Sequence, residues 1–224
     1  MFETLAKSLP QLLEGLQTTL GLTILSLILG TLLGILLAAI RVYGRFPLPY
    51  LVMIYERVFR GIPLIVIFFL IYFGLSLQLG IGLDAFTAAI FGLGLRSAAY
   101  QAQIFRSAIN SIPEGQMIAA KSLGMSKLES IQYIIIPQML RLSIPGWSNE
   151  FTIVLKDTSI AFSIGVIEIM RQGRYIYVRN PDLTLYVLLL IGLIYFILVF
   201  SANKGLSYLE KKYKISGFEI GTER

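Results

Sequence analysis

The residues best suited to chemistry are ionisable side chains that stand inside long apolar stretches. They are Arg96, Glu150 and the adjacent pair Lys156 and Asp157. A charged group is costly in hydrocarbon, so such residues usually face a cavity, a partner residue or a ligand. Arg96 offers a planar fork of donors for a carboxylate, and Glu150 offers acceptors for an ammonium or guanidinium group. This pair suits either an ion pair between two helices or a binding site for a zwitterion.

The chain that carries these residues is strongly apolar. Of its 224 residues, 56% are hydrophobic and 14% are charged, and its mean hydropathy is +0.75. These values lie outside the range of ordinary soluble domains. Five apolar stretches are each near the about 20 residues that a helix needs to cross a bilayer: 17–40, 61–78, 83–105, 138–165 and 183–203. Long apolar runs without strict alternation predict helices, so we expect an all-α polytopic membrane bundle with five transmembrane helices.

Basic residues cluster in the segments that join or follow these stretches. Arg41, Arg45, Arg57 and Arg60 follow the first stretch, Lys121 and Lys127 lie in the central polar segment, and Lys204, Lys211, Lys212, Lys214 and Arg224 lie in the tail. The positive-inside rule places these segments in the cytoplasm, with the amino end outside and the carboxyl end inside. The segment 168–182, with Arg171, Arg174 and Arg179, is the exception. The net charge of +6 therefore reports topology, and nucleic-acid binding is not expected.

Several classes of chemistry lack their usual residues. The sequence contains no cysteine and no histidine, which removes disulfides and the usual zinc ligands. It also lacks the GxxxxGK[ST] pattern of a phosphate-binding loop. No nucleophile and base are arranged as in an enzyme. We therefore expect neither enzymatic activity nor a metal or other cofactor in this chain.

The central polar segment, 111–137, begins with a predicted helix. Ser111 and Glu114 have the spacing of a capping box, in which each side chain accepts a backbone N–H at the helix start. Gly124 supplies the left-handed residue that ends a helix. The first part of the segment is therefore predicted to be one short helix.

A second capping box follows at once, with Ser126 and Glu129. This helix is predicted to run to Pro137, where the chain re-enters the membrane. The segment is thus expected to form two short cytoplasmic helices joined at Gly124. The alternative is an amphipathic loop that lies in the lipid headgroups.

At these residues the sequence resembles the membrane-spanning permease subunits of binding-protein-dependent (type I) ABC importers, in the polar amino acid branch. The family's loop has paired alanines, a glycine four residues later, and an isoleucine-rich run that ends in proline. Here these are Ala119, Ala120, Gly124 and the IIIP at 134–137. The stretches 55–75, 97–116 and 137–173 resemble the same branch. Ile118 and Gln103 depart from the pattern, because an acidic residue is usual at both positions.

The resemblance implies one permease domain over 1–224, with a core of about 15–205, a coupling loop of about 111–127 and a cytoplasmic tail at 204–224. The implied coupling residues are Ser111, Glu114, Gly115, Ala119, Ala120 and Gly124. They would dock onto cytoplasmic ATP-binding subunits, which bind ATP and Mg in place of this chain. The other implied partners are a second permease subunit, identical or homologous, an extracytoplasmic substrate-binding protein, the amino acid substrate and membrane lipid.

The predicted substrate path consists of Arg96, Asn149, Glu150, Ile153 and Asp157. An acid near the midplane suits a cationic side chain, so we expect import of polar amino acids of the arginine, lysine or histidine type across a bacterial inner membrane. Glutamine, glutamate or cystine-like substrates are the alternative. A secondary transporter that runs on an ion gradient is a further alternative, although the chain shows no internal repeat.

Overall fold

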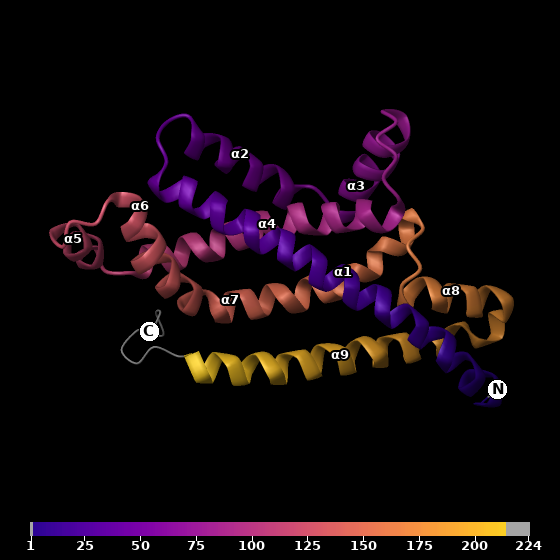
Figure 1. Cartoon of the computed structure of the whole chain (residues 1–224). Helices are drawn as coiled ribbons and strands as arrows, with labels where there is room; N and C mark the ends of the chain where they lie inside the picture. The colour runs from indigo at the N-terminus through magenta and orange to yellow at the C-terminus, as the bar shows by residue number, and fades with distance from the viewer. Residues whose placement is uncertain (1, 214–224) are drawn as a thin grey trace.

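A computed structural model of the chain describes residues 2–213, and this range contains helices and no β-strand (Figure 1). The all-α prediction is confirmed. The helices of the bundle are α1 (Phe2–Tyr43), α2 (Leu48–Gly61), α3 (Leu64–Phe69), α4 (Ala85–Ser111), α7 (Ile136–Asp157) and α9 (Thr184–Tyr213). The shorter elements are α5 (Glu114–Ser122), α6 (Lys127–Ser130), α8 (Ile169–Arg179), the π-helices η1 (Leu70–Gln78) and η2 (Ile131–Ile135), and the 3₁₀-helices η3 (Thr158–Ile164) and η4 (Pro181–Leu183). Residues 214–224 of the predicted tail, with Lys214 and Arg224, lie outside the described range.

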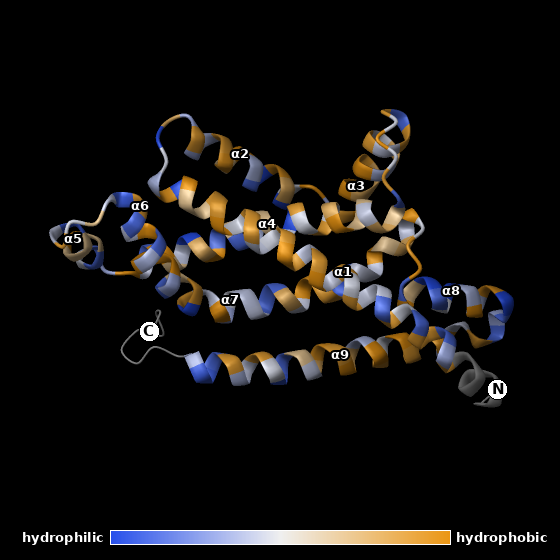
Figure 2. Ribbon diagram, in the orientation of Figure 1, coloured by the Kyte–Doolittle hydropathy of each residue, from blue (hydrophilic) through white to orange (hydrophobic). Residues whose placement is uncertain are grey.

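Two helices in the described range are long and apolar enough to cross a membrane alone, at Leu9–Tyr43 and Pro181–Tyr213. Hydrophobic residues predominate along most of α9, while hydrophilic residues gather at α6 and α8 and occur in α5 (Figure 2). A third candidate is the bent pair formed by α2 with α3 and η1. The helices α4 and α7 also run through the bundle. They carry the ionisable residues of the predicted path, and length and composition do not identify them as spans. The count of five spans therefore stays a prediction.

A sharp bend lies at the start of the predicted span at 61–78. α2 ends at Gly61, and the chain turns by 106° before α3 begins. Pro63 explains the break, since a proline disfavours helical backbone at the residue before it. Ile62 is accordingly extended, with φ −92° and ψ 133°. The polar segment predicted as a loop after the first span is thus largely a helix that packs against α1 and α4.

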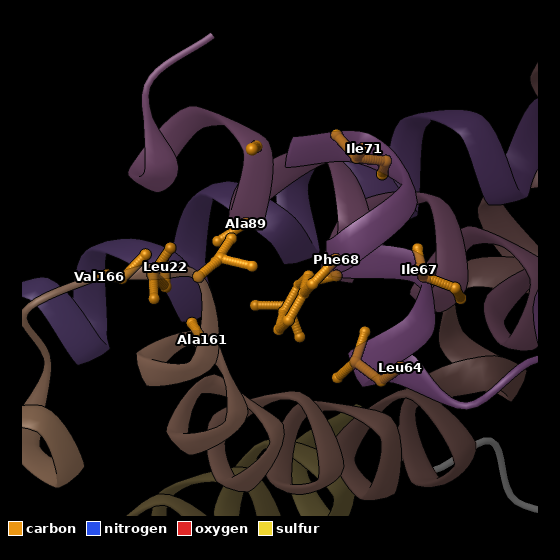
Figure 3. Packing of buried hydrophobic residues seen from close by; sticks show 11 residues of the cluster. Leu22, Leu64, Ile67, Phe68, Ile71, Ala89, Ala161 and Val166 are labelled. Atoms are coloured by element: carbon orange, nitrogen blue, oxygen red, sulfur yellow. The ribbon is translucent and has the colours of Figure 1, made fainter. Parts of the chain in front are cut away.

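The first half of the bundle is held by an apolar core around Phe68. This side chain is fully buried, and it packs with Leu22 of α1, Ala89 of α4 and Ala161 of η3 (Figure 3). Burying a phenylalanine contributes about 1.5–3 kcal/mol. The short helix α3 is therefore anchored against three other elements despite the bend that precedes it.

Glycines let α1 and α4 approach closely. A Cβ atom added at Gly34 would lie 2.9 Å from the Cβ of Gln101, and one added at Gly30 would lie 3.1 Å from the Cβ of Ser97. Small residues at membrane-helix contacts permit such approach of two backbones. These glycines bring polar side chains of α4 against α1.

The predicted helix stop at Pro137 needs correction, and the predicted fourth span at 138–165 is helical but changes its helix type near its end. The chain stays helical from Lys127 to Asp157 because the π-helix η2 precedes Pro137, which sits in the first turn of α7, where its missing N–H is tolerated. At the other end α7 stops at Asp157 and tightens into the 3₁₀-helix η3. Gly165 directly follows that helix, and its φ of 101° is left-handed.

Basic residues occur at both ends of the bundle. The helix α8, with exposed Arg174 and Arg179, lies at the end opposite α5 and α6, which carry Lys121 and Lys127 (Figure 1). Counting basic residues therefore gives a weaker indication of orientation than the sequence suggested. The predicted orientation of the two termini stays a prediction.

Candidate functional site

The first part of the site lies where α4 meets α7. Ser97 of α4 donates a hydrogen bond of 2.7 Å to one carboxylate oxygen of Glu150 on α7. The Glu150 side chain is buried, with 3% of the residue exposed. A buried carboxylate needs such donors, because an unpaired charge in a low-dielectric interior is costly. Since Arg96 directly precedes Ser97, Arg96 and Glu150 lie at the same level of the bundle.

A chain of hydrogen bonds continues from Ser97 to α1. Gln101 donates to Ser97 at 3.1 Å, Thr31 donates to Gln101 at 2.8 Å, and Trp147 donates to Thr31 at 3.0 Å. Buried polar networks of this kind fix the relative position of the elements that they join. This network joins α1, α4 and α7 around Glu150. Sequence reasoning missed Thr31 and Ser97 because small hydroxyl residues are common in membrane helices.

Arg96 pairs with the other acidic residue of α7. Its Nη1 atom lies 2.5 Å from the Oδ2 atom of Asp157, and the two side chains are 21% and 22% exposed. The ion pair between Arg96 and Glu150, one of the two alternatives that the sequence left open, is therefore not formed.

The remaining predicted path residues do not join these contacts. Asn149 is exposed on α7, and Ile153 is half-buried one turn beyond Glu150. The structure thus brings Arg96 together with Asp157, and Glu150 together with Ser97. It leaves Asn149 and Ile153 as neighbours of the site.

The predicted coupling loop forms a separate feature, at α5 and α6. The predicted box of Ser111 and Glu114 is wrong, because Ser111 is the last residue of α4 and its hydroxyl donates to the backbone oxygen of Ala108. Instead, α5 begins at Glu114 directly after Pro113, with no side-chain cap. The predicted stop at Gly124 is confirmed, with φ 82°.

The second predicted capping box, formed by Ser126 and Glu129, is confirmed. The Ser126 hydroxyl accepts from the Glu129 N–H at 3.3 Å, and the Glu129 carboxylate accepts from the Ser126 N–H at 2.8 Å. The hydrogen bonds from Ser126 lower the pKa of Glu129 below its usual range. Lys127 donates to the backbone oxygen of Tyr43, at the end of α1, at 3.0 Å. The loop therefore has a defined shape and one direct link to α1.

The surface of this loop is apolar as well as polar. Leu123, Leu128 and Ile118 are 83%, 72% and 64% exposed. Ala120 is buried, whereas its neighbour Ala119 is exposed, together with Glu114 and Gly115. Exposed apolar side chains on a rigid element are typical of a protein-binding surface.

Sequence comparison gives the class of protein. Residues 30–215 match the family described as "Binding-protein-dependent transport system inner membrane component". The chain belongs to this family, and within it to the type I ABC importer permeases of the polar amino acid branch. Membership makes it a membrane transport subunit and supports an importer over the ion-gradient alternative. It also implies ATPase and binding-protein partners.

Two relatives and one solved structure illustrate the similarity. The glutamine transport system permease protein GlnP of Escherichia coli (strain K12) is 34% identical over 93% of this chain and 95% of that one. The arginine transport system permease protein ArtQ of Bacillus subtilis (strain 168) is 35% identical over 88% of this chain and 90% of that one. A solved structure, "Crystal structure of an amino acid ABC transporter with histidines", is 35% identical, has a TM-score of 0.84, and covers 95% of this chain and 98% of that chain.

Proposed function

We propose that this permease imports basic amino acids, and that Glu150 binds the cationic side chain of the substrate. The observation that carries the proposal is the position of this carboxylate. It is buried between α4 and α7, and the one hydrogen bond that it accepts in the described range comes from the neutral Ser97 hydroxyl. Its negative charge therefore has no direct cationic partner there. A guanidinium or ammonium group from a substrate would supply one.

The pairing of Arg96 supports this assignment. Because Arg96 binds Asp157, it does not neutralise Glu150 directly. In the proposal Arg96 stands at the same level and attracts the substrate carboxylate. The exposure of about one fifth of its side chain leaves it accessible from the proposed path, which Asn149 and Ile153 border.

The names of the relatives are consistent with two classes of substrate. GlnP is named for glutamine and ArtQ for arginine, and the chain is almost equally similar to both. The alternative is therefore import of glutamine, glutamate or a cystine-like substrate. The buried Glu150 favours a cation, since a neutral substrate would leave this charge without a partner.

The coupling loop is proposed to dock onto a cytoplasmic ATPase subunit, which binds ATP and Mg. Its proposed contacts are the exposed Glu114, Gly115, Ala119 and Gly124. Ser111, at the end of α4, and the buried Ala120 would support the shape of this surface. The fixed turn at Gly124 and the capping box at Ser126 support docking over adsorption to lipid, because adsorption does not require so rigid a shape. The link from Lys127 to Tyr43 gives motion of the loop a direct route to α1.

The proposal includes a second permease subunit, identical or homologous, and an extracytoplasmic binding protein. Five spans enclose too little space for an alternating-access path, so two subunits are needed to form one. The coupling loop and the carboxyl end would face the cytoplasm, with the amino end outside.

The test is uptake of radiolabelled amino acids by the purified complex in proteoliposomes, with unlabelled amino acids competing pairwise. Arginine, lysine and histidine are expected to compete with one another, and ATP should be required. Uptake of glutamine that excess arginine does not inhibit would contradict the proposed specificity. Uptake without ATP would contradict the coupling.

A further inference from the structure

Two guanidinium groups from different helices lie over one aromatic ring. The Cζ atoms of Arg60 and Arg96 are 5.0 and 5.1 Å from the centroid of the Tyr100 ring. Arg96 and Tyr100 are four residues apart, so they share one face of α4. Arg60 reaches the same face from the last turn of α2 and also donates to the side-chain oxygen of Gln103. The aromatic ring favours both cations at this point through cation–π attraction.

This cluster lies at a break in a membrane-crossing segment. Arg60 precedes the 106° bend between α2 and α3, and these helices are apolar enough to cross a membrane only as a bent pair. Discontinuous helices often form the substrate sites of transporters. An ionisable residue inside such a span usually serves a function. Arg60 was expected in a cytoplasmic loop, but it lies in the last turn of α2, which packs against α4.

The two arginines differ in their partners. Arg96 binds the carboxylate of Asp157, whereas the side-chain partner of Arg60 is the neutral amide of Gln103. Glu56 lies one turn before Arg60, but the two form no ion pair in the described part of the chain. Arg60 is also exposed. Its fork of donors is therefore suited to a carboxylate, which a guanidinium binds through two parallel hydrogen bonds.

We propose that Arg60, held beside Arg96 by the Tyr100 ring, binds the α-carboxylate of the amino acid. This inference rests on the proposed function, and it adds a contact to the group that all amino acid substrates share. Ser97 directly follows Arg96 and binds Glu150, so the carboxylate and side-chain contacts lie at one level of α4. Arg60 would then set affinity for any amino acid, while Glu150 would select the side chain.

The experiment measures equilibrium binding of radiolabelled arginine, glutamine and agmatine to the purified transporter complex without binding protein. Agmatine is arginine without its carboxylate. Arg60→Gln is expected to lower the affinity for arginine and for glutamine by about tenfold, which corresponds to one charge-assisted contact, and to leave agmatine binding unchanged. Arg60→Lys keeps the charge but loses the fork, so its loss should be smaller. Arg57→Gln removes an exposed arginine one turn earlier in α2 and serves as the matched control.

All affinities are compared per assembled complex, which separates binding from folding. Equal binding of both amino acids by Arg60→Gln and the native protein would overturn the carboxylate site and leave the proposed function intact. An equal loss for agmatine would do the same, because it would indicate a general structural role. If the native complex binds neither amino acid, the proposed function fails and the inference fails with it.

Discussion

Arg96 on α4 and Asp157 at the end of α7 form an ion pair, with 2.5 Å between Nη1 and Oδ2. The bond spans 61 residues of sequence and joins the two helices at the residue where α7 gives way to η3. The same guanidinium lies over the Tyr100 ring and forms no ion pair with Glu150 in the described residues. The geometry of the whole site depends on this pairing.

Replacing Asp157 with Asn should therefore destabilise the protein. The change leaves Arg96 without its charged partner, and a cost of about 1–3 kcal/mol is expected because both side chains are only partly exposed. Denaturant unfolding in detergent measures the change. Lys156→Gln alters the adjacent exposed residue and is the control, with a change within about 0.5 kcal/mol. Equal stability of Asp157→Asn and Lys156→Gln would argue against a structural role for the ion pair.

The contact between α1 and α4 gives a second prediction. A Cβ atom at Gly34 would press on Gln101, so Gly34→Ala is expected to destabilise the protein by about 1–3 kcal/mol. The matched control is Gly192→Ala in α9, where nothing lies within 4 Å of the added atom. There the better helix propensity of alanine should stabilise the helix by up to about 1 kcal/mol. The prediction fails if the two substitutions change the unfolding free energy in the same direction.

Gly124 tests the shape of the coupling loop. Its φ of 82° is strained for residues with a side chain, and least so for asparagine. Gly124→Val is expected to distort the turn at a cost of about 1–2 kcal/mol and to reduce co-purification of the ATPase subunit. Gly124→Asn should retain most of it. Normal ATPase recovery with Gly124→Val would remove this turn from the docking surface.

The lowered pKa of Glu129 predicts that the stability of α6 depends on pH. Its pKa is lowered by Ser126, so the capping box stabilises α6 above the usual glutamate pKa of about 4.3, and the contribution is lost as the pH falls through the lowered value. Ser126→Ala should raise the pKa of Glu129 toward its usual range. Carbon-13 NMR titration of the labelled side-chain carboxyl measures both values. An identical titration in the native protein and in Ser126→Ala would show that the box does not set the pKa.

Local backbone conformation was predictable from the sequence. The left-handed Gly124 and the box at Ser126 were predicted correctly because each depends on residues within one or two turns. Ser111 was misassigned because its spacing to Glu114 fits a box, while the length of α4 decides which helix it belongs to. That length depends on packing between helices, which the local pattern does not contain.

The pairing within the site was not predictable for a related reason. Glu150 and Asp157 are seven residues apart, so they share one face of α7, and helical periodicity does not distinguish which of them meets Arg96. Similarly, apolar composition indicated a span after residue 61, but composition does not record a bend. The contact of Arg60 with Tyr100 depends on the packing of α2 against α4, which a local sequence pattern does not contain.

The central claim is that Glu150 binds the cationic side chain of the substrate. Glu150→Gln keeps the size of the side chain and removes its charge, which weakens a contact worth about 1.5–3 kcal/mol. The most direct measurement is uptake of arginine and glutamine by this variant in proteoliposomes, normalised to assembled complex. Arginine uptake should fall by roughly tenfold or more, and any glutamine uptake should fall less. Equal losses for both substrates, or a loss that disappears after normalisation, would contradict the claim.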